Sequence, residues 1–270
     1  MKKIELNIGW QDRCDTDFYV TELLNYTEKP FDKISVAQRT HDKYYDDQTS
    51  KYYHMSVDDI LAAWEEKAVR SQIIGHALDD FTGVIVEPVR MRDHYNITMQ
   101  SWLDKYSNDT VIMAIANGWK NYWQRLSDLG YYFVCREQPL SRQCGDHTIR
   151  GRADMIVYYP PKNTVLIIDW KTVEKMDNGT SFSVPMLGPD WVKRYPQCKL
   201  NHYGLQVNTY HSMVEDICND EYNITSAIVH IEHNGNVNTY QHPVKYDREQ
   251  MDELLSWCIK RKIEEPLLYS

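Results

Sequence analysis

The sequence lacks several features that would assign it to a whole class of proteins. Its 270 residues contain no run of about 20 apolar residues, so no transmembrane helix is expected. The first residues, Met1 to Asn7, have no apolar core of the kind that a signal peptide needs. No internal repeat and no low-complexity tract occurs. These absences predict a globular, cytoplasmic protein without a membrane partner.

Positive charge is also scarce, because 30 Lys and Arg residues stand against 39 Asp and Glu residues and the net charge is −9. This balance disfavours a protein that binds nucleic acid over its whole surface, which normally needs a basic face. Cations nevertheless gather in two places among aromatic or strand-forming residues. They are Lys193, Arg194 and Lys199 in the segment 191–199, and Arg136, Arg142, Arg150 and Arg152 further upstream. Such groups suit a phosphate backbone with stacked bases, and a solvated loop equally well.

Two neighbouring segments have the pattern of a β-hairpin. Residues 149–159 read as one strand, and residues 164–172 are strongly apolar and β-branched, as in a buried strand. The proline-rich segment 160–163 supplies the turn between them. The sequence therefore predicts two adjacent antiparallel strands.

This hairpin would bring three reactive side chains together. Asp154 would lie beside Asp169, and strand alternation would direct Asp169 and Lys171 to one face and Trp170 to the other. Two carboxylates and an ammonium group at one spot form the set that metal-assisted phosphodiester hydrolysis needs. Carboxylates around an empty metal site repel one another, so removal of Asp169 is expected to leave stability unchanged or slightly raised.

At Gly151-Arg152-Ala153-Asp154 and Asp169-Trp170-Lys171 the chain resembles the PD-(D/E)xK nuclease superfamily, in its RecB-like branch. The resemblance implies that Asp154 and Asp169 ligate a metal ion, that the Trp170 carbonyl adds a ligand, and that Lys171 is catalytic. Ala153 stands where the name of the superfamily has proline, and the Gly-Arg-x-Asp form is common in this branch. An ordinary hairpin with acidic ends is the alternative interpretation.

The segment after the hairpin extends the resemblance. Residues 199–217 have helical periodicity, and Gln206 and Tyr210, four residues apart, share one face of the expected helix. RecB-like nucleases carry a Gln-x-x-x-Tyr motif on this helix. The resemblance implies that both side chains orient the lysine or grip the phosphate backbone. A tyrosine packed in the core with a glutamine at its edge is the alternative.

A helix is also predicted upstream, over residues 56–82, with apolar residues recurring at helical intervals from Ile60 to Ile74. Near its end stand His76 and Asp80, four residues apart. The corresponding helix of RecB-like nucleases ends in a histidine with an acid one turn later. The resemblance therefore implies His76 as a metal ligand and Asp80 as a supporting acid, although the usual Gly-Thr pair is absent. Glu137 is a further supporting candidate.

The expected order of elements matches the restriction-endonuclease-like fold that the resemblance implies. Helices at 56–82 and 96–129 precede strands at 130–140, 148–159 and 164–172, and a helix at 199–217, strands at 225–233 and 236–243 and a helix at 247–263 follow. We expect an α/β core, in which helices flank a mixed central sheet, with an N-terminal, mostly helical extension. The expected divisions are an extension over 1–55, a nuclease core over 56–245 and a C-terminal helix over 246–270 that packs on the core.

The resemblance implies a metal-dependent DNA nuclease, foremost an exonuclease of DNA recombination, repair or replication, using one or two Mg²⁺ or Mn²⁺ ions. Its partner would be single- or double-stranded DNA. Further possible partners are a second copy of the chain and a recombination or replication protein. The helix at 56–82 also resembles that of stand-alone bacteriophage nucleases, which would place the protein in the host cytoplasm. Two alternatives remain: an endonuclease acting on DNA or RNA, and a non-catalytic nucleic-acid-binding or assembly protein on a nuclease scaffold.

Some RecB-like nucleases hold an iron–sulfur cluster on one upstream cysteine and three close-set cysteines near the C-terminus. The cysteines of this chain are scattered and never form a Cys-x-x-Cys pair. We therefore expect no iron–sulfur cluster and reduced, buried thiols. The six are Cys14, Cys135, Cys144, Cys198, Cys218 and Cys258.

Overall fold

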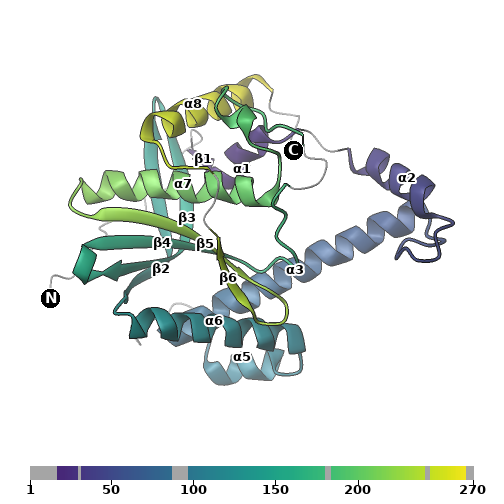
Figure 1. Ribbon diagram of the computed structural model, residues 1–270, viewed down its shortest axis with the longest axis horizontal. Coiled ribbons are helices and arrows are strands. Elements are labelled where there is room, and N and C mark those ends of the chain that lie inside the picture. The colour runs from purple at the N-terminus through teal and green to yellow at the C-terminus, as the bar shows by residue number, and fades with distance from the viewer. Residues whose placement is uncertain (1–16, 30–31, 87–96, 180–183, 241–243, 266–270) are drawn as a thin grey trace.

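One mixed six-stranded sheet forms the centre of the molecule, with helices on both faces (Figure 1). This computed structural model describes residues 17–29, 32–86, 97–179, 184–240 and 244–265. The strands follow the order β1-β3-β4-β5-β6, and β2 also pairs with β3. Their bounds are β1 (Asp17–Tyr19), β2 (Tyr132–Cys144), β3 (His147–Tyr159), β4 (Thr164–Lys171), β5 (Asn223–Ile231) and β6 (Val237–Tyr240).

Strand β3 has different neighbours along its two edges. β2 runs antiparallel beside almost its whole length. The other edge is shared, because β1 pairs in parallel with residues 148–150 and β4 pairs antiparallel with residues 155–159. Between these two neighbours, residues 151–154 have no strand partner on that edge among the described residues. The Gly-Arg-x-Asp segment therefore lies in a gap between two strands of the sheet.

Several helices begin at side chains that cap them. The Asp59 carboxylate accepts hydrogen bonds from Ser56 N and Oγ at the start of α3, and Asp109 accepts from Val111 N and Ile112 N at the start of α6. The α-helices are α1 (Val20–Leu24), α2 (Lys33–Tyr44), α3 (Val57–Val86), α5 (Met99–Tyr106), α6 (Thr110–Asp128), α7 (Lys199–Cys218) and α8 (Arg248–Glu264), and short 3-10 turns are η1 (Asn25–Thr27), η2 (Pro160–Lys162) and η3 (Val192–Arg194).

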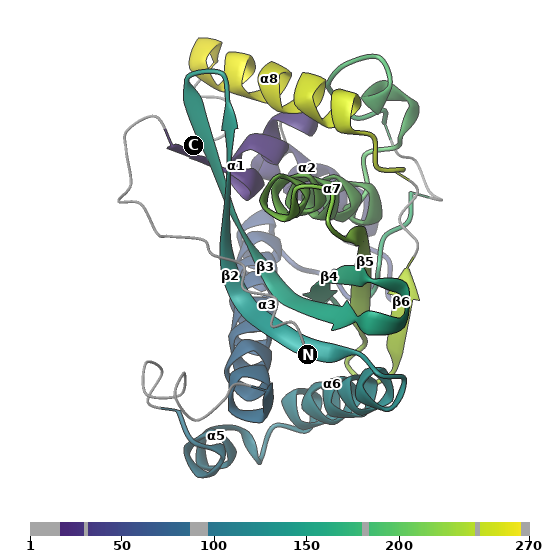
Figure 2. The same cartoon turned by 90° about the vertical axis from the view of Figure 1, so that its left-hand side faces the viewer.

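The sheet separates two buried apolar clusters. On one face it packs against α1, α7 and α8, whose buried residues include Leu23, Leu205 and Leu254. On the other face it packs against α3, α5 and α6, with Trp102 and Trp119 in the core. Figure 1 shows α7 and α8 on one side of the sheet and α5 and α6 on the other, and Figure 2 shows β2 and β3 bending past α7 toward α8. The predicted arrangement, a mixed sheet flanked by helices, is confirmed.

Strand β4 shows the predicted alternation. Ile167 belongs to the cluster under α7, whereas Ile168 and Trp170 belong to the cluster under α3 and α6. Asp169 and Lys171 therefore continue the α7 face of the strand. β4 also pairs in parallel with β5, and α7 connects the two strands.

The N-terminal residues contribute more to the sheet than their sequence suggests. Residues 17–19 form β1, and Val20, Leu23 and Leu24 of α1 are buried in the core under α7. Their sequence has no sustained periodicity, so we assigned them to an extension. The predicted boundaries at residues 55 and 245 stay predictions.

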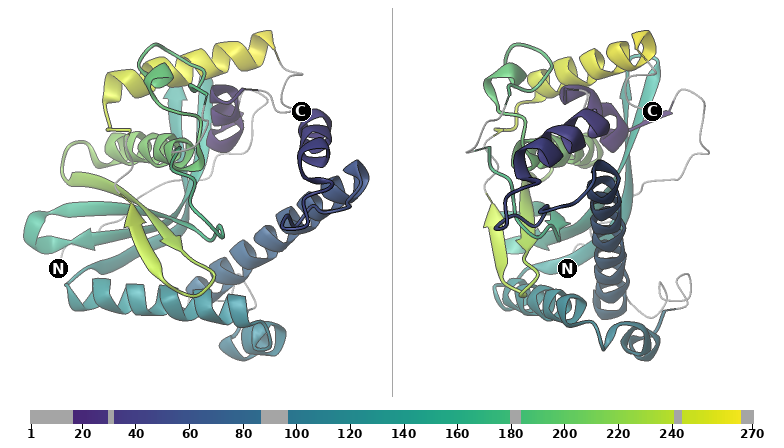
Figure 3. Two further views of the ribbon diagram at one scale, coloured as in Figure 1. Left: turned by 45° about the vertical axis from the view of Figure 1, so that its right-hand side comes forward. Right: turned by 90° about the vertical axis from the view of Figure 1, so that its right-hand side faces the viewer.

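Helix α3 is longer than predicted, and part of it is exposed. Ile60 and Ile74 are buried, but Ile73 and Val69 are exposed. The first half of α3 lies beside α2, away from the sheet, as Figure 3 shows. None of the described helices is long and apolar enough to cross a membrane.

Candidate nuclease site

The two aspartates lie where β3 and β4 separate. The last paired rung of the two strands is Met155 with Ile168, so Asp154 and Asp169 come directly after it. Beyond this rung Trp170 N donates to Asp154 Oδ2 at 2.8 Å. The Asp154 carboxylate therefore accepts the hydrogen bond that a backbone carbonyl of β3 would accept in a continuous ladder. The strands can part here without leaving that N–H unpaired. Both carboxylates are thereby placed at the open end of the hairpin, as predicted.

Lys171 completes a chain of polar contacts that reaches α7. Its Nζ lies 2.6 Å from Asp169 Oδ2 and donates to Gln206 Oε1 at 3.3 Å. Gln206 Nε2 in turn donates to the Tyr210 hydroxyl at 2.8 Å, and Lys171 Nζ also lies 4.5 Å from the centre of the Tyr203 ring. The expectation that Gln206 and Tyr210 share the helix face toward β4 is confirmed. Tyr203, one turn earlier on that face, is outside the Gln-x-x-x-Tyr motif, so the sequence did not single it out.

The charges of the site hold Lys171 in its ammonium form. Burial alone would lower the pKa of this lysine, but the negative charges of Asp169 and Asp154 outweigh burial and raise the pKa above its ordinary value. Asp169 is only 1% exposed, so the ion pair is shielded from water. The expectation that loss of Asp169 leaves stability unchanged considered only the repulsion between carboxylates, and the ion pair with Lys171 adds a cost to that loss. Loss of Asp169 would leave a buried ammonium without its closest partner.

The site favours the charged form of Lys171 but disfavours the charged form of Asp154. Burial and the neighbouring charge of Asp169 raise the pKa of Asp154 well above its ordinary value, and Asp79 and Glu137 add to the effect, whereas Lys171 opposes it. One ammonium group therefore does not balance the carboxylates gathered here. Such an excess of buried negative charge is relieved by protonation or by a cation.

This shift predicts how the stability of Asp154→Asn depends on pH without divalent ions. A raised folded-state pKa means that ionisation of Asp154 costs stability above its unfolded-state pKa, and the cost disappears at lower pH, where both states are protonated. The asparagine variant should therefore melt higher than the parent at pH 7, with a gain that shrinks as the pH falls toward 4. Thermal denaturation across this range, with EDTA present, measures the gain. A variant that melts lower at pH 7 would contradict the charge excess.

Helix α3 contributes an acid that the sequence did not single out. Asp79, not Asp80, lines a cavity together with Asp154, and its Oδ1 accepts from Trp170 Nε1 at 3.1 Å. Burial raises the pKa of Asp79 despite this hydrogen bond. His76 lies three residues before Asp79 and is exposed, and Asp80 is half-buried. The roles of His76 as a ligand and Asp80 as a supporting acid stay predictions.

Glu137 does lie beside the aspartates. It interrupts the ladder opposite Asp154, between the Arg136–Met155 and Gln138–Ala153 pairs, and its backbone has a φ of 46°. A non-glycine residue in this left-handed region is uncommon and costs local strain. Burial and the charge of Asp79 raise the pKa of Glu137, and Arg152 Nη1 lies 3.3 Å from its Oε2.

The donors suit a hard divalent cation. Carboxylate oxygens of Asp154 and Asp169 and a backbone carbonyl are ligands of the kind that Mg²⁺ and Mn²⁺ prefer, and Mg²⁺ commonly needs only one or two carboxylates because it keeps several waters. Among the residues that the structure describes, no three His, Cys, Asp or Glu side chains form a closed metal site. The oxygen chemistry and the excess negative charge fit such an ion, with water and substrate completing its shell.

Gly151 explains why the motif begins with glycine. A Cβ at this position would lie 2.5 Å from Cε1 of Tyr210 and 3.1 Å from Cγ2 of Val20. Only a residue without a side chain allows the Tyr210 ring to pack directly on β3. The glycine of the β3 motif and the tyrosine of the α7 motif thus pack against each other, a contact that the sequence could not show.

The cations expected to bind nucleic acid divide into exposed and buried groups. Arg152 is exposed beside the acids, and Lys193, Arg194 and Lys199 are exposed on η3 and at the start of α7. Arg136 and Arg142 are buried. Arg136 Nη1 donates to the Asp79 carbonyl at 3.1 Å, and Arg142 pairs with Asp216 and Asp252. These two arginines stabilise the fold and are not part of an exposed basic surface.

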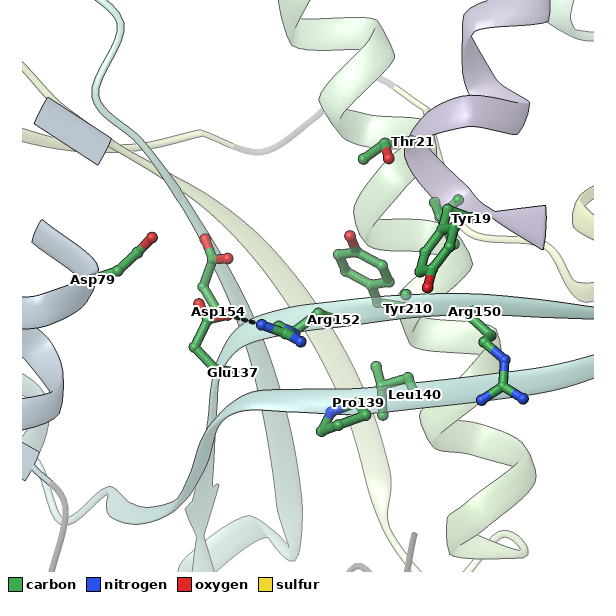
Figure 4. A pocket seen from close by; sticks show the side chains of 12 residues that line it. Tyr19, Thr21, Asp79, Glu137, Pro139, Leu140, Arg150, Arg152, Asp154 and Tyr210 are labelled. Carbon is green, nitrogen blue, oxygen red and sulfur yellow. Dashed lines mark hydrogen bonds and ion pairs between the residues drawn. The ribbon is translucent and has the colours of Figure 1, made fainter. Parts of the chain in front are cut away.

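A cavity of about 350 Å³ adjoins the carboxylates (Figure 4). Asp79, Glu137 and Asp154 lie at one end, and Arg150 lies toward the other, with Tyr19 and Tyr210 between them. The full lining is Tyr19, Val20, Thr21, Asp79, Glu137, Pro139, Leu140, Arg150, Gly151, Arg152, Asp154 and Tyr210. Tyr19, Val20 and Thr21 carried no sequence signal, because a three-residue strand shows no periodicity.

Comparisons with known proteins leave the family open. No family model and no curated protein matches the chain. Among solved structures, a "Putative exonuclease" from Eubacterium rectale is similar with a TM-score of 0.48 and 12% identity, over 94% of this chain and 86% of that one. The protein SSO0001 is similar with a TM-score of 0.37 and 12% identity, over 93% and 78% of the two chains. Neither likeness is strong enough to bear on activity, which has to be judged from the site itself.

Proposed function

We propose that this protein is a metal-dependent DNA nuclease of the PD-(D/E)xK, RecB-like type, and foremost an exonuclease of DNA recombination, repair or replication. One observation carries the proposal: Asp154, Asp169, Lys171, Gln206 and Tyr210 form one contiguous polar site at the opening of a buried hairpin. Five residues from β3, β4 and α7 thus lie close together, which supports the proposal.

Asp154, Asp169 and the Trp170 carbonyl would hold one or two Mg²⁺ or Mn²⁺ ions. A bound ion supplies Lewis-acid polarisation of the phosphate and lowers the pKa of a coordinated water. The raised pKa of Lys171 favours an ammonium group that orients the water and offsets negative charge on the phosphate. Gln206 touches the lysine from the side of α7 and donates to the Tyr210 hydroxyl, so both act as positioning residues.

Cleavage of end-labelled linear DNA tests this function. We expect labelled linear single- or double-stranded DNA to be shortened from its ends with Mg²⁺ or Mn²⁺, and not with EDTA. Closed circular DNA of the same sequence should persist, because an exonuclease needs an end. Cleavage of the circle would instead establish an endonuclease. A folded protein that cleaves none of these substrates with either ion would overturn the proposal.

A further inference from the structure

The cavity beside the carboxylates has one acidic and one basic end. On β3, Arg150 and Arg152 share one face, because side chains alternate along a strand, and Asp154 follows them. The strand advances four residue steps from Arg150 to Asp154, which span about 13 Å. All three line the cavity. A ligand bound at the carboxylates thus extends toward guanidinium groups.

The cavity lies at the gap in the sheet. Along β3, the pairing with β1 ends at Arg150, opposite Tyr19, and the pairing with β4 starts at Met155. The first residues of α1, Val20 and Thr21, form the wall on the β1 side. Because neither strand covers residues 151–154, a ligand there lies directly against the β3 backbone.

Aromatic rings form the middle of the cavity. Tyr19 is the rung partner of Arg150, and Figure 4 shows its ring between Arg150 and Tyr210. Tyr210 is only 3% exposed and is held by the Gln206 hydrogen bond and by its packing on Gly151. A rigid ring close to a guanidinium group suits a ligand with both a flat apolar part and an anionic part.

The size of the cavity restricts the ligand. About 350 Å³ lies near the lower limit of the roughly 300–1,000 Å³ typical of small-molecule sites. It suits one nucleotide and is too small for two paired strands. We propose that this cavity binds a single nucleotide of an unpaired strand, directly next to the scissile phosphate, with Arg150 holding the following phosphate and Tyr19 lining the nucleoside. This inference rests on the proposed nuclease function and specifies its substrate as a single-stranded segment at the site.

Direct binding of thymidine 3′,5′-bisphosphate, which carries one nucleoside and two phosphates, tests the inference without requiring cleavage. Calorimetric titration in Mg²⁺ buffer should show saturable binding to the parent. Arg150→Gln should weaken it by about tenfold or more, as for the loss of one contact to a charged group. Tyr19→Leu should weaken it as well, and should weaken inorganic phosphate binding much less. Arg125→Ala, an exposed arginine on α6, is the matched control and should keep the parental affinity.

The outcomes separate this inference from the proposed function. In one outcome the protein cleaves DNA, but neither Arg150→Gln nor Tyr19→Leu weakens bisphosphate binding. This outcome would overturn the nucleotide site and leave the proposed nuclease function standing. In the other outcome the protein cleaves no DNA, but it binds the bisphosphate saturably and both variants weaken this binding. This outcome would support the nucleotide site and overturn the proposed nuclease function. A melting curve of each variant shows whether it is folded. If Tyr19→Leu does not fold, the binding measured for Arg150→Gln decides the test.

Discussion

Replacing Lys171 with methionine is expected to lower DNA cleavage by at least a hundredfold to a thousandfold, the effect of removing one charged donor from a preorganised site. Lys171 contacts Asp169 and Gln206, and its side chain is 17% exposed at the centre of the site. Methionine keeps most of the apolar stem but has no charge to offset that of the phosphate. Single-turnover rates with saturating Mg²⁺ or Mn²⁺ measure the loss.

The same ion pair predicts a stability effect that separates chemistry from folding. Removing one member of a buried pair leaves the other uncompensated and commonly costs about 3–5 kcal/mol, so Lys171→Met and Asp169→Asn should each melt lower than the parent without metal. The double variant removes both charges and should recover most of the stability. It should not recover cleavage. A folded Lys171→Met protein that cleaves DNA at the parental rate would rule out the assignment.

Substituting alanine for Gly151 is expected to damage both the fold and the rate. The new Cβ would lie 2.5 Å from Tyr210, whose ring is buried and cannot withdraw freely. Overpacking of this kind costs about 1–3 kcal/mol. A displaced Tyr210 loses its hydrogen bond to Gln206, which touches Lys171, so turnover should fall on the order of tenfold to a hundredfold.

Gly75→Ala provides the matched control for this substitution. Gly75 lies inside α3, and a Cβ there meets no atom within 4 Å. Alanine favours a helix over glycine by up to about 1 kcal/mol, so this variant should melt slightly higher and cleave at the parental rate. If Gly151→Ala behaves like Gly75→Ala, the contact between Gly151 and Tyr210 does not position the site.

Much of the site could be predicted because its members follow local periods. Asp169 and Lys171 share a face through the two-residue repeat of a strand, and Gln206 and Tyr210 share one through the helical repeat. The turn at 160–163 is short, so it also determines which strands meet. Each of these relations is fixed within a few residues of backbone, and the sequence alone contains that information.

The remaining parts of the site depend on contacts between distant segments. Asp79 lines the cavity with Asp154 because of how α3 packs on the sheet, with Ile74, Ala77 and Leu78 buried, and no local period in the sequence records that packing.

The sequence by itself determined the two strands, the helix that follows them and the faces that their reactive residues share, because backbone repeats impose these locally. Only the tertiary structure decided that Tyr19 lies next to Arg150, that Gly151 receives the ring of Tyr210, and that Arg142 is buried. These contacts join residues far apart in the chain. Close packing fixes such contacts, and no period in the sequence records them.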